Sequence, residues 1–108
     1  MTEAIVTATA GPDRVDIAIS GEIDLANHAD VETQLHAEID NRTTAVRIDL
    51  TGVTFIDSTG LRLLFGLVTT LERLQVPLEV SAPASSPARR VIDLSGLSSL
   101  VSMVPDGG

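Results

Sequence analysis

The chain has 108 residues, a length that fits one domain with a single hydrophobic core. Hydrophobic residues make up 44% of the chain and neither Trp nor Tyr occurs, so Leu, Ile, Val and Ala must build that core and aromatic platforms for stacking bases are not expected. The formal net charge is −8, and all basic residues are Arg. Because such a charge repels phosphate backbones and anionic membrane surfaces, we expect neither nucleic acid nor a membrane as a partner.

The first third of the chain predicts a hairpin followed by a helix. Hydrophobic side chains alternate over residues 4–10 and 14–23, and the turn sequence Gly-Pro-Asp lies between them, so we expect two antiparallel strands. Residues 24–39 carry apolar side chains at roughly helical intervals, beginning with Leu25. We therefore expect a helix over this whole range.

The remainder of the chain alternates between strand and helix periodicity. Residues 45–50 and 77–82 predict strands, residues 58–74 predict a helix, and residues 85–103 predict a helix broken near Gly96. Strands joined through helices run parallel by right-handed crossovers, so the sheet is expected to be mixed. Since each strand has one apolar and one polar face, the predicted fold class is α/β, with helices packed mainly on one face of a roughly four-stranded sheet.

The helix predicted over residues 58–74 has one buried and one exposed stripe. The expected buried stripe comprises Leu61, Leu63, Leu64, Leu67, Val68, Leu71 and Leu74, and the expected exposed stripe comprises Arg62, Gly66, Thr69 and Arg73. Gly66 has two interpretations. It is either a tolerated weakness in the helix or a site where a partner helix approaches closely.

The residues at the start of this helix are Asp57, Ser58 and Thr59. Ser58 lies four residues before Arg62 and therefore heads the exposed stripe. Both Asp and Ser are favoured capping residues, but Asp57 alone can cap the helix. Ser58 is then either a second capping residue or an exposed hydroxyl suited to phosphorylation, since the positive end of the helix tolerates the phosphate.

Other chemistry is not supported by the sequence. Cysteine is absent, and His28 and His36 lack a third ligand at metal-binding spacing, so we interpret them as a solvated pair. Ser58 has no G-x-S-x-G elbow, and no P-loop, kinase motif or lysine is present. Arg89 and Arg90 precede a predicted helix and are either solvated or part of a binding surface. We expect no catalytic residue, metal or cofactor.

The expected location of the protein is the cytoplasm. No apolar stretch is long enough to span a bilayer, and the N-terminus lacks the basic and apolar regions of a secretory signal. The absence of cysteine agrees with a reducing compartment. We expect a monomer when the protein is free.

Three stretches resemble the recognition stretches of the STAS-domain anti-sigma factor antagonists, in the same order. They are ISGEIDL at residues 19–25, FIDSTGLRLL at residues 55–64 and ARRVIDLSGL at residues 88–97. The resemblance covers nearly the whole chain and implies a single STAS domain over residues 1–108.

This resemblance implies a partner-switching protein that regulates a sigma factor, as in transcriptional stress responses, and not an enzyme. In the family, the unphosphorylated antagonist binds an anti-sigma factor that is itself a serine kinase, and this releases the sigma factor. The kinase phosphorylates the serine that matches Ser58, and a serine phosphatase reverses the step. The implied partner-binding residues are Glu22, Asp24, Asp57, Thr59, Gly60 and Arg62.

Two alternatives remain open at this point. The chain is also compatible with a STAS module that is not switched, serving as a scaffold or as a subunit of a larger signalling or transport assembly, with Ser58 only a cap. It is also compatible with a small nucleotide-binding domain.

Overall fold

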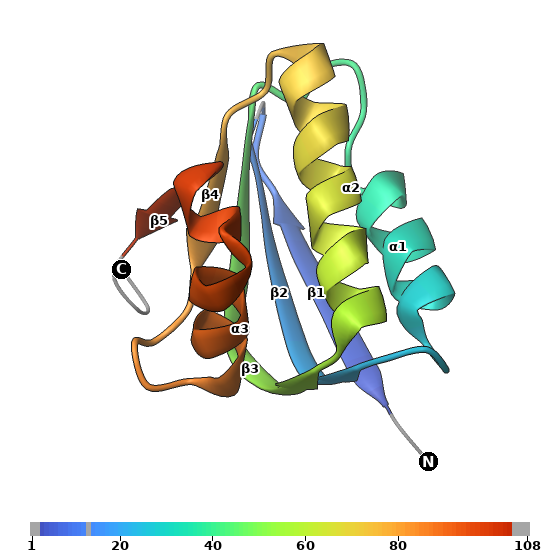
Figure 1. Ribbon diagram of the computed structural model, residues 1–108. Coiled ribbons are helices and arrows are strands. Elements are labelled where there is room, and N and C mark those ends of the chain that lie inside the picture. Colours follow the sequence, from blue (N-terminus) through green and yellow to red (C-terminus); the bar gives the residue numbers. More distant parts are fainter. Residues whose placement is uncertain (1–2, 13, 105–108) are drawn as a thin grey trace.

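The computed structural model describes residues 3–12 and 14–104, which form a single sheet covered by a layer of helices (Figure 1). The elements of the described residues are β1 Ala4–Ala10, β2 Arg14–Ile23, α1 His28–Ala37, β3 Ala45–Ile56, α2 Ser58–Leu74, β4 Leu78–Ser81, α3 Pro87–Ser95, the short 3₁₀ helix η1 Leu97–Ser99 and β5 Ser102–Val104. The strand order is β1-β2-β3-β4-β5. Strand β1 pairs antiparallel with β2, and the other neighbours are parallel. The predicted α/β class, the mixed sheet and the helical layer on one face are confirmed.

The opening hairpin forms as predicted. The backbone N–H of Gly11 donates to the carbonyl of Arg14 at 2.7 Å and closes the turn, within which Asp13 lies outside the described residues. In β2, Val15 and Ile17 are buried, whereas Asp16 between them is exposed. This alternation gives the sheet one apolar face for the helices to cover.

The core fills the space between the sheet and the helices. Its buried side chains come from β2, β3 and β4, from the residue after β4, from the three α-helices and from η1. They are Val15, Ile17, Ile19, Ile23, Val31, Leu35, Val46, Ile48, Leu50, Val53, Ile56, Leu63, Leu64, Leu67, Val68, Leu71, Val80, Ala82, Ala88, Ile92 and Leu97.

The sheet has a fifth strand that the sequence did not predict. Gly96 adopts φ 86° and ends α3, so the predicted break is confirmed. The chain after Gly96 forms η1 and then β5, whose Met103 pairs with Val80 of β4. The end of the predicted helical segment is therefore an edge strand, because the chain turns back at Gly96 and meets the free edge of β4.

Two apolar side chains are more exposed than their periodicity predicted. The first helix begins at His28 and not at residue 24, so Leu25 lies in the preceding loop and is 72% exposed. Leu74 is the last residue of α2 and is 56% exposed, because the helix ends at Gln75 in a left-handed conformation and burial along the stripe stops at Leu71. Within the described residues, no helix is long and apolar enough to cross a membrane.

Candidate functional site

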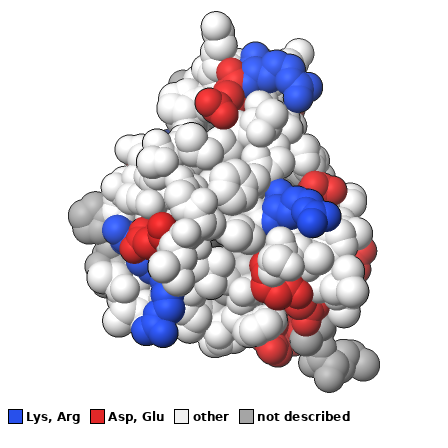
Figure 2. Space-filling view, in the orientation of Figure 1, with Lys and Arg blue, Asp and Glu red and all other residues white. Residues whose placement is uncertain are grey.

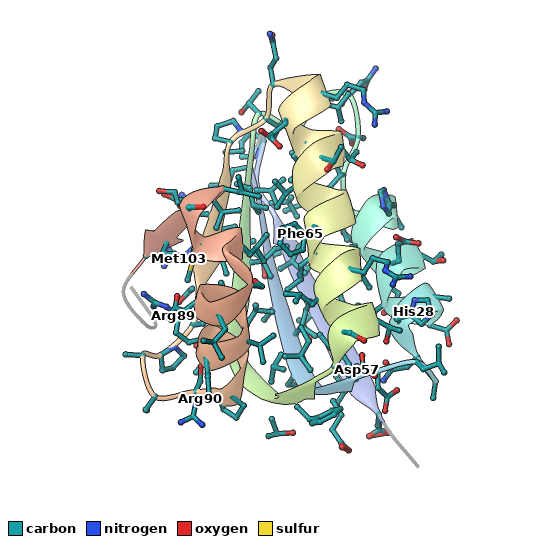
Figure 3. The ribbon with its side chains drawn as sticks, in the orientation of Figure 1. His28, Asp57, Phe65, Arg89, Arg90 and Met103 are labelled. Atoms are coloured by element: carbon teal, nitrogen blue, oxygen red, sulfur yellow. The ribbon has the colours of Figure 1, made fainter. Side chains whose placement is uncertain are left out.

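The candidate site lies at the end of the molecule where all three α-helices begin (Figure 3). Each helix follows the carboxyl end of a parallel strand, and β3 ends at Ile56 directly before Asp57. The pairing of β2 with β3 contains two register shifts near this end, after Ala18 and after Gly21. Such bulges re-aim side chains, and here Phe55 is 47% exposed while Ile56 is buried.

Asp57 is the capping residue of α2. Its Oδ1 accepts hydrogen bonds from the backbone N–H groups of Thr59 at 2.9 Å and Gly60 at 3.0 Å, and also from the Thr59 hydroxyl. Its Oδ2 accepts from the backbone N–H of Leu25 at 3.3 Å. Both carboxylate oxygens are therefore engaged by donors of the protein itself.

These hydrogen bonds favour the ionised form of Asp57. The hydrogen bond from the Thr59 hydroxyl is the largest cause that lowers the pKa of Asp57, and the backbone N–H groups of Gly60, Thr59 and Leu25 lower it further. Burial acts in the opposite direction but does not outweigh them. A negative charge thus lies beside Ser58 at neutral pH.

Ser58 is the first residue of α2, and its side chain is exposed. No other described residue is hydrogen-bonded to its hydroxyl, and the capping bonds to the helix come from Asp57. The interpretation of Ser58 as a cap is therefore wrong. Thr59 differs from its neighbour because its side chain is half-buried and its hydroxyl donates to Asp57.

The loop after β2 brings two further predicted residues to the same place. Glu22 is the second-last residue of β2, and its carbonyl accepts from the Asn27 side-chain amide at 2.7 Å. Asp24 follows the strand, and its Oδ1 accepts from the backbone N–H of Ala26 at 2.9 Å. The backbone N–H of Asp57 donates to the carbonyl of Ile23, which joins this loop to the start of α2.

Gly60 allows α2 to approach the end of β2. A Cβ at this position would lie 2.8 Å from Cγ1 of Ile56, 2.9 Å from Cγ2 of Ile23 and 3.1 Å from the Ile23 carbonyl oxygen. Real Cβ atoms essentially never come within 3.0 Å of another atom, as the first two distances would require. The glycine is therefore required by packing, and it sets the distance between the two halves of the site.

Arg62 lies one turn beyond Ser58, and its side chain is exposed. It lines a hollow of about 140 Å³ between α1 and α2, together with His28, Glu32, Thr59 and Leu63. Among the described residues, none forms an ion pair with Arg62. The structure thus places all six predicted partner-binding residues at or beside the loop after β2 and the first turns of α2.

A second hollow is lined in part by Phe55. It has a volume of about 340 Å³ and lies between the end of β3 and the start of α3; its lining residues are Phe55, Ile56, Ser85, Pro87, Arg90 and Val91. Arg89 contacts the protein itself, since it donates to Asp93 and to the carbonyl of Ala82. Arg90 is exposed at the start of α3 (Figure 3).

Charged side chains are sparse over the helical face of the molecule. Figure 2 shows acidic and basic side chains in small separate groups, with a wide uncharged area between them. Within the described part of the chain, no three His, Cys, Asp or Glu side chains are grouped so that they can hold a metal ion. The face in Figure 2 carries no extended cationic surface among its described residues.

Sequence reasoning missed the loop residues Leu25 and Asn27. Hydrophobic periodicity assigned them to a helix, whereas Leu25 binds Asp57 and Asn27 holds the carbonyl of Glu22. The residue type of Asp24 could have indicated this loop. Its carboxylate accepts the backbone N–H two residues further along the chain, and Asp favours this kind of turn before a helix.

The chain belongs to the STAS domain family, whose model matches residues 5–106. A solved anti-sigma factor antagonist from Mycobacterium paratuberculosis is similar, with 26% identity, a TM-score of 0.85, and coverage of 97% of this chain and 88% of that one. The anti-sigma factor antagonist SpoIIAA in its unphosphorylated form has 21% identity and a TM-score of 0.76, covering 94% and 87% of the two chains. The Bacillus cell fate determinant SpoIIAA in its phosphorylated form has 22% identity and a TM-score of 0.72, covering 94% and 90%. No protein with a curated description matches the sequence.

Proposed function

We propose that the protein is an anti-sigma factor antagonist controlled by phosphorylation of Ser58. In this proposal the unphosphorylated form binds an anti-sigma factor that is a serine kinase and so releases the sigma factor. A serine phosphatase removes the phosphate and restores binding. The protein then consists of a single STAS domain and acts in the cytoplasm as a regulator, not as an enzyme. It is monomeric when free.

The observation that carries this proposal is the exposed Ser58 hydroxyl beside an aspartate that already caps the helix. Because Asp57 supplies the cap, the Ser58 side chain has no structural task among the described residues. The role of antagonist is supported by the similarity to the mycobacterial protein described as one. SpoIIAA, which shares the fold, is described in both phosphorylated and unphosphorylated forms.

The phosphate transfer itself needs groups that the kinase and ATP provide. Oγ of Ser58 attacks the γ-phosphorus of ATP, the bond from that phosphorus to the bridging oxygen breaks, and ADP leaves. The hydroxyl proton passes to a base of the kinase. The contribution of the antagonist is to present Oγ at the surface, at a helix start whose free N–H groups tolerate the product.

Charge repulsion explains how the phosphate releases the partner. Phosphoserine carries about −1.5 to −2 charges at neutral pH. It would lie beside the ionised Asp57, and near Asp24. Two unit negative charges about 4 Å apart repel by roughly 4 kcal/mol at an effective dielectric constant of about 20, so each unit of phosphate charge that faces a partner acid at this distance weakens binding by nearly a thousandfold. Refolding of the domain is not required.

The test combines the purified protein, an anti-sigma factor kinase of the organism that produces it, and ATP. Mass spectrometry of the peptides locates any phosphate, and we expect it on Ser58 and not on Thr59, whose hydroxyl is engaged by Asp57. Binding should be lost as phosphate accumulates, and Ser58→Asp should bind more weakly than the wild type. Equal affinity of Ser58→Asp and wild type would overturn the switch. Stable binding without phosphate, to a kinase active on another substrate, would favour the unswitched scaffold.

A further inference from the structure

Ser58 and Arg62 lie on the same side of α2, one helical turn apart, and both side chains are exposed. Side chains four residues apart on a helix have Cβ atoms about 5–6 Å apart, and an acid that precedes a base by four residues is the favourable order for an ion pair. Unmodified Ser58 carries no charge. Phosphorylation of Ser58 would create this acid four residues before Arg62.

The guanidinium of Arg62 is available for such a pair. No ion pair joins it to another described residue, although Glu32 of α1 lines the same hollow. The two oxygens of Asp57 accept hydrogen bonds from other donors of the site. On the next turn, Gly66 has no side chain, and outside the backbone of the helix no atom lies within 4 Å of the position that its Cβ would occupy.

We propose that Arg62 is the internal counter-ion of phosphorylated Ser58, and that phosphorylation withdraws this arginine from the partner surface. The guanidinium binds phosphate oxygens in a planar, bidentate geometry that lysine does not provide. The partner then meets an added phosphate and also loses a cation that the unphosphorylated surface offered. This inference rests on the proposed function, because it assumes that Ser58 is the modified residue.

The pair can be tested without any kinase. Phosphoserine is placed at residue 58 during translation by genetic-code expansion, and the second ionisation of the phosphate, near pH 6, is followed by ³¹P NMR. A neighbouring cation favours the doubly charged phosphate and lowers its pKa. Relative to the wild type, Arg62→Gln should raise the phosphate pKa by about 0.3 units, the shift expected for an exposed ion pair one helical turn apart.

Control variants separate the effect of Arg62 on the phosphate pKa from the electrostatic effect of the other charges of the protein. Arg73→Gln removes an exposed arginine from the same helix, eleven residues further along, and should leave the phosphate pKa unchanged. Arg62→Lys keeps the positive charge, so its phosphate pKa should lie closer to that of the wild type than to that of Arg62→Gln.

The charged and titratable groups around the pair are Glu22, Asp24, His28, Glu32 and Asp57. Because the His28 side chain lines the same hollow as Arg62, the comparison is repeated in a His28→Gln background.

The outcomes distinguish this inference from the proposed function. An equal phosphate pKa in the wild type and Arg62→Gln, or an equal shift in Arg73→Gln, would overturn the pairing while leaving kinase-dependent switching intact. Conversely, the absence of any kinase acting on Ser58 would overturn the proposed function, yet the ³¹P measurement would still report whether Arg62 binds a phosphate at this position.

Discussion

Asp57 joins two segments that lie 32 residues apart in the chain, because its Oδ2 accepts the backbone N–H of Leu25 while its Oδ1 caps α2. The loop after β2 and the start of α2 are therefore held by one carboxylate. A partner that contacts both segments would meet a surface that is already assembled. This limits the conformational entropy that binding has to remove.

The first prediction concerns the two roles of the Asp57 carboxylate. Asp57→Ala removes the cap and the bond to Leu25, and we expect it to lower the free energy of unfolding by about 1–2 kcal/mol. Asp57→Asn keeps an oxygen for the cap but presents an amide donor to the Leu25 N–H, so its loss should be smaller. Urea unfolding at pH 7 measures both variants. Equal losses would show that the cap contributes nothing beyond the bond to Leu25.

The second prediction is the pH dependence that follows from the lowered pKa of Asp57. The folded-state pKa lies below the unfolded value of about 3.9, so the stabilisation is complete above that value and is lost as the pH falls through the folded-state pKa. The stability difference between wild type and Asp57→Asn should therefore be constant from pH 7 to pH 5 and shrink below about pH 4. Urea titrations across this range measure it. A difference that grows on acidification would contradict the sign of the pKa shift.

The sequence predicted the sheet and α2 well because their signals are strong and local. In β2, buried and exposed side chains alternate without exception from Val15 to Ile19. Helix α2 presents a long apolar stripe, and an aspartate precedes its first residue. Periodicity alone gives the face that each of these elements buries.

The parts that the sequence did not predict depend on contacts between distant segments. Leu25 fits a helical pattern of apolar residues. Hydrogen bonds of Asp24 and Asn27 nevertheless stabilise a turn at this position, and α1 begins only at His28. Strand β5 has only three residues, and it forms because Met103 meets Val80 at a free sheet edge. The position of Ser58 was predictable, whereas the bond between Asp57 and Leu25 follows from the tertiary fold.

The third prediction uses two glycines of the same helix as a matched pair. Gly60→Ala places a methyl group within 3 Å of Ile56 and Ile23, and we expect this overpacking to cost about 1–3 kcal/mol. Gly66→Ala meets no atom within 4 Å and replaces a poor helix former, so it should stabilise the protein by about 1 kcal/mol. Thermal and urea unfolding of both variants measure the opposite signs.

The Gly66 variant also addresses partner contact. If a partner helix approaches closely at this position, Gly66→Ala will be more stable than the wild type and yet bind the kinase more weakly. If its affinity is unchanged, the glycine is only a weak point of the helix. Destabilisation by Gly66→Ala would contradict the open space above this residue.

The fourth prediction concerns Ser58 itself in the absence of phosphate. Since Asp57 is the cap and the Ser58 hydroxyl has no partner among the described residues, Ser58→Ala should change the free energy of unfolding by less than about 0.5 kcal/mol. Thr59→Ala provides the comparison, because its hydroxyl donates to Asp57 and its loss should cost more. A large destabilisation by Ser58→Ala would assign the serine a structural role and weaken the case for a site kept for modification.

The last prediction concerns Asn27, which holds the loop that carries the acidic residues. Its amide donates to the carbonyl of Glu22 at 2.7 Å, and its Oδ1 accepts the backbone N–H of Asp24 at 3.0 Å. Asn27→Ala leaves both half-buried backbone groups without these partners, which should cost about 1–3 kcal/mol. The exposed Asn41, without a side-chain hydrogen bond to the described residues, provides the matched control, and Asn41→Ala should be neutral.

Partner binding gives Asn27→Ala a second readout. The loop carries Glu22 and Asp24 beside α2, so its loosening should weaken binding to the kinase even at temperatures where the variant is fully folded. Affinity is measured by calorimetry on protein whose folded state is verified by circular dichroism. An Asn27→Ala variant that loses stability but binds as tightly as Asn41→Ala would show that the partner depends on α2 alone, and it would remove Glu22 and Asp24 from the proposed binding surface.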